Sequence, residues 1–175
     1  TEFGFNPGQK VIDVGSGGGH YTFPLSKSVG NEGQIYSLDI KKESLIALRN
    51  QATRDGFNNI EVIWGDIEKM GGTKLKNEVV DGVVFSNLLF QLADKNTALM
   101  EASRILKNGG KLCVVEWSEL SFMSGIKHEG QNLIINKEDV IKLIVSAGFK
   151  QEKSFDAGEH HYGLVFLKPT STASN

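Results

Sequence analysis

The sequence predicts a doubly wound α/β domain built on a seven-stranded, mostly parallel sheet with an antiparallel terminal strand. Three observations carry this prediction. Short apolar runs alternate with helical patterns, a glycine cluster follows the first apolar run, and a short polar connection joins the last two strand-like runs. The chain has 175 residues, of which 39% are hydrophobic and 23% charged, which fits one globular domain with a sizeable core.

The first part of the chain is expected to supply three strands and two helices. Short apolar runs predict strands over Lys10–Val14, Gln34–Asp39 and Ile60–Trp64. A helix-compatible stretch begins at about His20, directly after the glycine cluster. Leu45, Leu48 and Ala52 then recur at helical spacing, and Gly56 is expected to end that second helix.

The middle of the chain predicts two further strands around a helix. Val79–Phe85 is nearly continuously apolar, as expected of a strand that is buried on both faces of a parallel sheet. Leu99 and Leu106 belong to one face of a predicted helix, which is expected to stop at the glycine cap 108–110. Lys111–Trp117 follows as the fifth strand. Strand and helix are thus expected to alternate five times before the terminal pair of strands.

The last third is expected to close the sheet with a hairpin. Residues 118–135 show no periodicity and predict a long loop, after which Asn136 is expected to cap a helix bearing Val140. The last two strands are Phe149–Phe155 and Tyr162–Leu167. Their connection is too short for a crossover helix, so these two strands must be antiparallel.

Composition and the chain ends limit the function classes. A net charge of −2 provides no general field for phosphate backbones, so no nucleic-acid partner is expected. The sequence contains no signal peptide and no 18-residue apolar run, so we expect no membrane span and a cytoplasmic protein. Residues 1–168 are expected to form one domain, with the loss of an N-terminal helix from it left open, and 169–175 a disordered tail.

Cys113 is the only cysteine, which excludes an intrachain disulfide and a cysteine-based metal cluster. It lies within a strand-like run, where a free cysteine usually behaves as a small buried apolar residue. No metal site is predicted.

The segment Val11-Ile12-Asp13-Val14-Gly15-Ser16-Gly17-Gly18-Gly19-His20-Tyr21 contains most of the first strand and the glycine cluster that follows it. Ligands of open α/β sheets bind beyond the carboxyl ends of the strands, and glycines there let the backbone approach a ligand. Alone, such a turn is also compatible with a tight connection that binds nothing. Counted from Gly15, the dinucleotide pattern G-x-G-x-x-G would place His20 at its third glycine, which argues against a dinucleotide.

The glycines at 15, 17 and 19, preceded by Asp13, resemble motif I of class I S-adenosylmethionine-dependent methyltransferases. Asp39 matches the family's ribose-binding acid and Asp66 its acid near the adenine amino group, although either could also be a cap or a solvated turn residue. The resemblance covers about residues 9–168 and is closest to the type 11 group typified by quinone-biosynthesis C-methyltransferases. It implies a Rossmann-like methyltransferase fold.

The resemblance implies S-adenosylmethionine as the methyl donor. The residues that it implies for cofactor binding are Asp13, Gly15, Ser16, Gly17, Gly19, Tyr21, Asp39, Ile40, Asp66, Ile67, Ser86 and Asn87. S-adenosylmethionine carries an ammonium and a sulfonium, so nearby acids favour it electrostatically. Asp81, at the start of the fourth strand, is expected on the far edge of the sheet in a structural role.

The acceptor side is less marked in the sequence. The terminal hairpin is expected at the ligand edge, which makes His160 and His161 candidates for catalysis as a base, against the alternative of a surface turn. Further residues expected to line the acceptor pocket are Leu88, Phe90, Gln91, Trp117 and Glu119. A small organic acceptor is expected, an aromatic or quinone-like compound being one candidate.

Other functions compete with this interpretation. Ser86-Asn87-Leu88-Leu89 stands where the family's amino-methylating nucleic-acid enzymes carry a Pro-Pro motif, and one cysteine does not suffice for arsenite methylation. A non-catalytic S-adenosylmethionine-binding domain remains an alternative, and a nucleotide-dependent oxidoreductase is a weaker one. The sequence carries no feature that assigns an oligomeric state.

Overall fold

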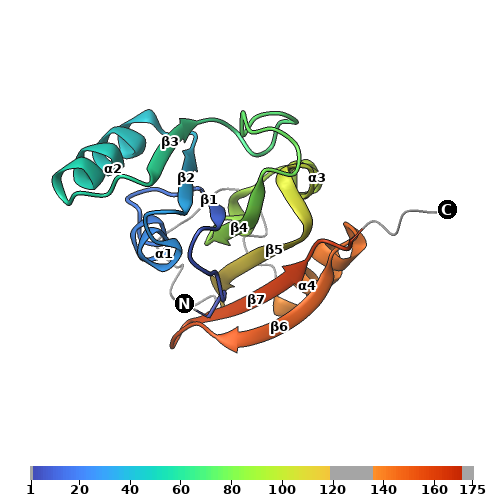
Figure 1. The fold of residues 1–175 in the computed structure, drawn as a ribbon. Helices are drawn as coiled ribbons and strands as arrows, with labels where there is room; N and C mark the ends of the chain where they lie inside the picture. Colours follow the sequence, from blue (N-terminus) through green and yellow to red (C-terminus); the bar gives the residue numbers. More distant parts are fainter. Residues whose placement is uncertain (1, 119–135, 171–175) are drawn as a thin grey trace.

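The computed structural model describes residues 2–118 and 136–170, and a seven-stranded sheet forms its centre (Figure 1). The strands lie in the order β3-β2-β1-β4-β5-β7-β6. Their bounds are β1 Lys10–Val14, β2 Gln34–Asp39, β3 Ile60–Trp64, β4 Val80–Ser86, β5 Leu106–Trp117, β6 Lys150–Asp156 and β7 His161–Leu167. The predicted fold class is confirmed.

Strand direction places the ligand edge of the sheet. The neighbours from β3 to β5 are all parallel, whereas β7 is antiparallel to both β5 and β6. The strand order reverses between β1 and β4, and such a switch point is where open α/β sheets bind ligands. His161 at the start of β7 pairs with Trp117 at the end of β5, so the terminal hairpin lies at that same edge, as expected.

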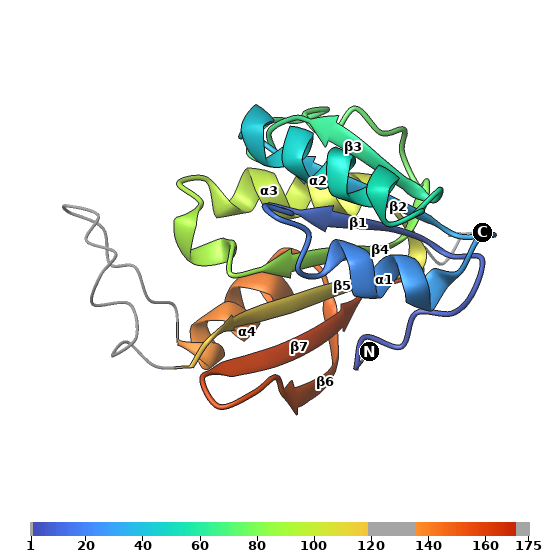
Figure 2. The same cartoon turned by 90° about the vertical axis from the view of Figure 1, so that its left-hand side faces the viewer.

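Helices cover both faces of the sheet (Figure 2). Their bounds are α1 Thr22–Val29, α2 Lys42–Arg54, α3 Lys95–Ile105 and α4 Lys137–Ser146, and one 3₁₀ turn, η1, spans Leu89–Gln91. In Figure 2 helices α1 and α2 lie on the near face, and α3 and α4 on the far face. The predicted cap of α4 is confirmed, because the Asn136 side chain accepts a hydrogen bond from the Asp139 N–H at 2.8 Å.

Two apolar clusters form the core, one on each face. The larger one joins β1, β4 and β5 to α3 and α4, with Phe85 and Phe166 as its largest fully buried side chains. The smaller one includes Phe3 and Phe5 ahead of β1, together with side chains of α1. Cys113 belongs to this second cluster and is fully buried, as the sequence predicted.

The boundary between α3 and β5 differs from the prediction. Helix α3 ends at Ile105, and Leu106 already pairs with Val80 as the first residue of β5. The N–H of Gly109 donates to the Lys168 carbonyl, so the chain is extended where the sequence suggested a helix end. Sheet pairing on both sides satisfies these backbone groups, and it outweighs the local helical pattern that included Leu106.

The predicted alternation of strand and helix is interrupted after β3. Within the described residues, the segment 65–79 between β3 and β4 contains turns but no helix. The fully buried carboxylate of Glu101 on α3 orders this loop by accepting hydrogen bonds from the N–H groups of Gly71 at 2.9 Å and Thr73 at 3.2 Å. Arg104 pairs with the same carboxylate at 2.7 Å. Hydrogen bonds to the Glu101 side chain therefore hold this segment, where the predicted alternation would place a helix.

Some predictions fall outside the described residues. The loop expected over 118–135 is described only at Ser118, so Glu119 cannot be placed, and the same holds for 171–175 of the expected tail. Among the helices that are described, none has the length and apolar character needed to cross a membrane.

Candidate cofactor site and acceptor edge

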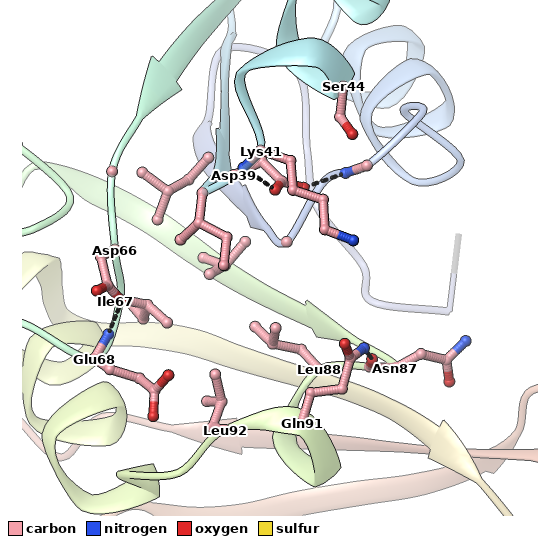
Figure 3. Close-up of a pocket in the computed structure, with 16 residues that line it drawn as sticks. Asp39, Lys41, Ser44, Asp66, Ile67, Glu68, Asn87, Leu88, Gln91 and Leu92 are labelled. Atoms are coloured by element: carbon pink, nitrogen blue, oxygen red, sulfur yellow. Dashed lines mark hydrogen bonds between the residues drawn. The ribbon is translucent and has the colours of Figure 1, made fainter. Parts of the chain in front are cut away.

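A cavity of about 310 Å³ opens at the carboxyl ends of the parallel strands (Figure 3). Its volume lies at the lower end of the range for ligand sites, about 300–1,000 Å³. It is lined by Val14, Gly15, Gly17, Leu38, Asp39, Ile40, Lys41, Ser44, Gly65, Asp66, Ile67, Glu68, Asn87, Leu88, Gln91 and Leu92. Seven of the predicted cofactor residues are therefore brought together, namely Gly15, Gly17, Asp39, Ile40, Asp66, Ile67 and Asn87.

The glycine turn depends on backbone conformations that favour glycine. Gly15 has φ +71°, and a Cβ there would lie 3.0 Å from the Leu88 Cδ1 atom. Gly17 has φ +49°, and its N–H donates a hydrogen bond to Asp39 Oδ2 at 2.9 Å. The turn can thus pass close to Leu88 while being tied to the end of β2.

Asp39 and Asp66 place two carboxylates on the cavity wall. The second oxygen of Asp39, Oδ1, accepts the N–H of Lys41 at 2.8 Å, so both carboxylate oxygens are held by backbone groups (Figure 3). Asp66 accepts the N–H of Glu68 at 3.0 Å and lies 3.2 Å from the Lys69 ammonium. Each carboxylate oxygen has a second lone pair, so both residues can still accept hydrogen bonds from a ligand.

Asp13 lies beneath the turn rather than among the cavity-lining residues. Its carboxylate is buried and accepts a hydrogen bond from the Thr22 hydroxyl at 2.6 Å, and that hydroxyl lies 3.0 Å from Ser37 Oγ. Burial raises the pKa of the Asp13 carboxyl to about 6, against the lowering effect of the Thr22 hydrogen bonds. The hydrogen bond between Asp13 of β1 and Thr22 of α1 connects the two elements on either side of the glycine turn and so stabilises the turn.

Four other predicted residues lie outside the cavity lining. Tyr21 is hydrogen-bonded with Ser86, and burial raises the pKa of the Tyr21 hydroxyl. Ser16 is buried in the turn, and its hydroxyl has no hydrogen-bond partner within the described residues. A Cβ added at Gly19 would meet the Phe23 ring at 2.7 Å, so this glycine allows close packing of the turn against α1.

His161 lies at the acceptor edge, next to the cavity wall. Its Nε2 atom is 3.3 Å from the side-chain nitrogen of Asn87, a lining residue, and its ring centroid is 4.0 Å from that of Trp117. Burial lowers the pKa of His161, and the charges of His160 and His20 lower it further. His161 is therefore mainly neutral at pH 7 and able to accept a proton. Neither His160 nor His161 lines the cavity itself.

Sequence reasoning missed Glu116 on β5. This carboxylate is only 4% exposed and accepts hydrogen bonds from the N–H groups of Leu88 at 2.9 Å and Leu89 at 2.7 Å. Burial raises the pKa of the Glu116 carboxyl to about 7, although these N–H groups and the Lys95 ammonium lower it. The sequence does contain a signal that could have pointed to Glu116, namely a single acid within an otherwise apolar strand that is expected to be paired on both sides. Such an acid is expected to be buried, and buried carboxylates are rare unless they have a partner.

Asp81 lies at the opposite edge of the sheet, as expected. It accepts the N–H of Lys10 at 2.8 Å and forms an ion pair with Lys107 at 2.7 Å. These contacts fasten the starts of β1, β4 and β5 to one another, so its role is structural.

Comparison with known proteins identifies the class. A family model described as a methyltransferase domain matches residues 5–156. The ubiquinone/menaquinone biosynthesis C-methyltransferase UbiE of Vibrio campbellii is 32% identical over 117 residues, covering 66% of this chain and 44% of that protein. The arsenite methyltransferase of Homo sapiens is 36% identical over 108 residues, covering 58% of this chain and 29% of that protein.

The fold is shared with solved methyltransferase structures. An S-adenosylmethionine-dependent methyltransferase from Aquifex aeolicus superimposes with a TM-score of 0.83 at 25% identity, over 95% of this chain and 86% of that one. The fold and the glycine turn thus define a class I S-adenosylmethionine-dependent methyltransferase domain. The chain belongs to the methyltransferase-domain family and is similar to UbiE, and it shares its fold with a putative type 11 methyltransferase from Sulfolobus solfataricus. It spans less than half the length of the curated relatives named above.

Proposed function

We propose that this chain transfers a methyl group from S-adenosylmethionine to a small organic acceptor. The observation that carries the proposal is the placement of Asp39 and Asp66 on one cavity wall beside the glycine turn. The ribose hydroxyls would donate hydrogen bonds to Asp39, and the adenine amino group would lie near Asp66. Ile40 and Ile67 add apolar surface for the adenine ring.

The hydrogen bonds of the turn favour this donor over a dinucleotide. A pyrophosphate needs free N–H groups and no acid close by. Here the N–H groups of Gly15 and Ser16 donate to the Leu38 carbonyl, and that of Gly17 donates to the Asp39 carboxylate. A site with these amides occupied and a carboxylate at the turn suits a cationic ligand without phosphate. The buried Ser16 hydroxyl is a further group that fits a polar ligand.

The donor and the protein contribute different parts of the proposed methyl transfer. When bound, S-adenosylmethionine supplies a methyl group on a sulfonium, which is a good leaving group. The protein has to align the acceptor, exclude water and, where the acceptor loses a proton, hold that proton. Leu88 and Leu92 form an apolar part of the wall, and neutral His161 next to Asn87 is the proposed proton acceptor.

An aromatic or quinone-like acceptor is the proposed substrate class. The rings of Trp117 and His161, tilted at 36° to each other, offer aromatic surface at the acceptor edge, and the relative from Vibrio campbellii is a C-methyltransferase of quinone biosynthesis by name. Methylation of arsenite is disfavoured for this chain, because its only thiol, Cys113, is buried in the core and burial raises the pKa of that thiol.

Isothermal titration calorimetry with S-adenosylmethionine, S-adenosylhomocysteine and NAD tests the donor. We expect both sulfur ligands to bind and NAD not to bind. Binding of NAD alone would overturn the proposal in favour of an oxidoreductase. Release of S-adenosylhomocysteine in the presence of aromatic and quinone-like compounds then tests turnover. If the chain binds the donor but releases no S-adenosylhomocysteine with any of the acceptors offered, it would instead be a non-catalytic binding domain.

A further inference from the structure

Glu116 is a buried carboxylate that the proposed reaction does not use. It is the penultimate residue of β5, and its Oε1 atom alone accepts both the Leu88 N–H and the Leu89 N–H. These two amides stand at the start of η1, the 3₁₀ turn that follows β4. A helical turn leaves its first N–H groups without partners inside the turn, and here a side chain from the neighbouring strand satisfies them.

The segment that Glu116 holds is one wall of the cavity. Asn87, Leu88, Gln91 and Leu92 all line the cavity, and they come from this single segment (Figure 3). Leu88 lies directly against the glycine turn, because a Cβ at Gly15 would approach its Cδ1 atom to 3.0 Å. The Gln91 side chain donates to the Asn87 carbonyl at 2.6 Å, which closes the segment on itself.

The conformation of this segment needs external support. Asn87 has φ +49°, a left-handed backbone conformation that costs free energy outside glycine. Its N–H donates to the Val115 carbonyl of β5, next in the chain to Glu116. The end of β5 therefore fixes the segment at three successive amides, those of Asn87, Leu88 and Leu89.

We propose that Glu116 is a positioning residue whose carboxylate holds residues 87–92 against the glycine turn and so sets the shape of the cavity wall nearest the acceptor edge. The identity of the ligand used to test this rests on the proposed function. Glu116 itself does not line the cavity, so it would act through Leu88 and its neighbours rather than by touching a ligand.

The charge state of Glu116 makes this support depend on pH. Besides the N–H groups of η1, the groups that face it are Lys95 of α3 and Tyr162 of β7, with Glu138 of α4 acting on the same tyrosine. Burial raises the pKa of Glu116 to about 7, so the carboxylate is mostly ionised at pH 8 and mostly protonated at pH 6. Hydrogen bonds to an ionised acceptor are roughly twice as strong as neutral ones, so acidification loosens the segment.

Calorimetric titration with S-adenosylhomocysteine at pH 6, 7 and 8 tests the inference. We expect the wild-type Kd to rise about three- to tenfold from pH 8 to pH 6, with a midpoint near pH 7. Glu116→Gln, which has the same shape and no charge, should bind more weakly than the wild type at pH 8 and lose the change in Kd between pH 8 and pH 7, where Asp13, with its pKa of about 6, stays ionised. Asp81→Asn is the control, because that carboxylate lies at the opposite edge of the sheet with Lys10 and Lys107 as its partners, and its loss should leave the wild-type pH profile of binding intact.

Amide hydrogen exchange provides a readout without ligand. The Leu88 and Leu89 amides should be protected in the wild type and lose protection at least about tenfold in Glu116→Gln. Unchanged protection, or a wild-type Kd that does not vary between pH 6 and 8, would overturn the inference. Failure of the wild type to bind S-adenosylhomocysteine at all would instead count against the proposed function, and the exchange experiment would still decide the role of Glu116.

Discussion

Asp39 uses one carboxylate for two tasks, holding the protein backbone and facing the cavity. Each of its oxygens accepts a backbone N–H, from Gly17 and from Lys41, while the residue lines the cavity. Replacing it removes acceptors from the ligand and also releases the glycine turn. Binding should therefore be more sensitive to Asp39 than a ligand contact alone would suggest.

We expect Asp39→Ala to weaken S-adenosylhomocysteine binding at least about tenfold, because each charge-assisted hydrogen bond is worth roughly 1.5–3 kcal/mol. Calorimetric titration measures the change. Asp81→Ala is the control, since this carboxylate lies at the opposite edge of the sheet with Lys10 and Lys107 as its partners. A twofold effect or less for Asp39→Ala would mean that Asp39 does not hold the ribose.

The terminal histidines belong to the acceptor edge. Replacing His160 and His161 together by alanine should abolish turnover and leave the affinity for S-adenosylmethionine within about twofold, because neither side chain lines the cavity. Release of S-adenosylhomocysteine and calorimetry measure the two quantities separately. Unchanged turnover would remove both histidines from the mechanism. His161→Ala alone should show most of the loss, since His161 is the histidine in contact with Asn87.

At the scale of elements, the loop between β3 and β4 is held by one buried side chain, Glu101, instead of by the hydrogen bonds of a helix. Burial alone would raise the pKa of Glu101, but hydrogen bonds from Arg104, Thr73 and Gly71 overcome it and lower the pKa to about 2. The same loop carries Asp66, whose N–H donates to the Gly72 carbonyl. The carboxylate of α3 therefore supports a residue of the candidate site from a distance.

Glu101→Gln should reduce the free energy of unfolding at pH 7 by roughly 3 kcal/mol, because it removes a carboxylate whose pKa is lowered by folding. The stabilisation is present above the unfolded pKa, near 4.5, and is lost as the pH falls towards 2. Urea unfolding at pH 7 and pH 3 measures it. The difference between wild type and variant should shrink at pH 3; an equal difference at both values would show that the charge of Glu101 is not responsible.

The regular elements of this fold were predictable from the sequence, and the exceptions have physical causes. The strands β1, β2 and β3 have the predicted bounds, because short apolar runs between turn residues are local signals. The end of α3 was wrong because Leu106 fits a helical face equally well, and only pairing with Val80 decides for the strand. The turns that stand in place of a helix after β3 are held by hydrogen bonds to Glu101, which is distant in sequence and carries no local signal.

The candidate site also contains residues that could be predicted from the sequence and others that could not. The positions of Asp39 and Asp66 at the ligand edge were predictable, because Asp39 is the last residue of β2 and Asp66 comes two residues after β3. Asp13 shares the turn's sequence pattern, yet its carboxylate is turned towards Thr22, which a pattern cannot distinguish. The contribution of Glu116 needs the distance between the end of β5 and the start of η1, which exists only in the folded chain.

For the whole molecule, buried acids set how stability changes with pH. Folding raises the pKa of Asp13 from 3.8 to about 6 and that of Glu116 from 4.5 to about 7. A raised carboxyl pKa means that the folded state binds protons more tightly, so stability falls as the pH rises between the unfolded and folded values. Glu101 acts in the opposite direction at more acidic pH, and His161, whose pKa is lowered by burial, opposes the fall as the pH rises towards its ordinary value of 6.5. Of these groups, Glu101 raises stability only up to about pH 4.5 and Asp13 and Glu116 lower it above about pH 4, so stability should be highest near pH 4 and already falling at pH 5.

We expect the free energy of unfolding to fall by about 2–4 kcal/mol between pH 5 and pH 8, one pKa unit being worth about 1.4 kcal/mol. Urea denaturation at both pH values measures this change. Glu116→Gln should remove the fall in stability between pH 6 and pH 7 and leave the part between pH 5 and pH 6 that is due to Asp13. A stability that is constant or rises over this range would contradict the shifts at Asp13 and Glu116.

Cys113 gives the molecule a built-in reporter of its own opening. It pairs with Val84 of β4 and Val165 of β7, so it lies at the centre of the sheet, and no other thiol exists in the sequence. Its side chain is buried in the apolar cluster that includes Phe3, Phe5 and Leu25, so a thiol-specific chromophoric reagent can react there only after this cluster opens. The labelling rate of the unmodified chain therefore measures how often the structure opens around Cys113. A bound ligand that slows the labelling would show that binding in the cavity stabilises this part of the sheet against opening.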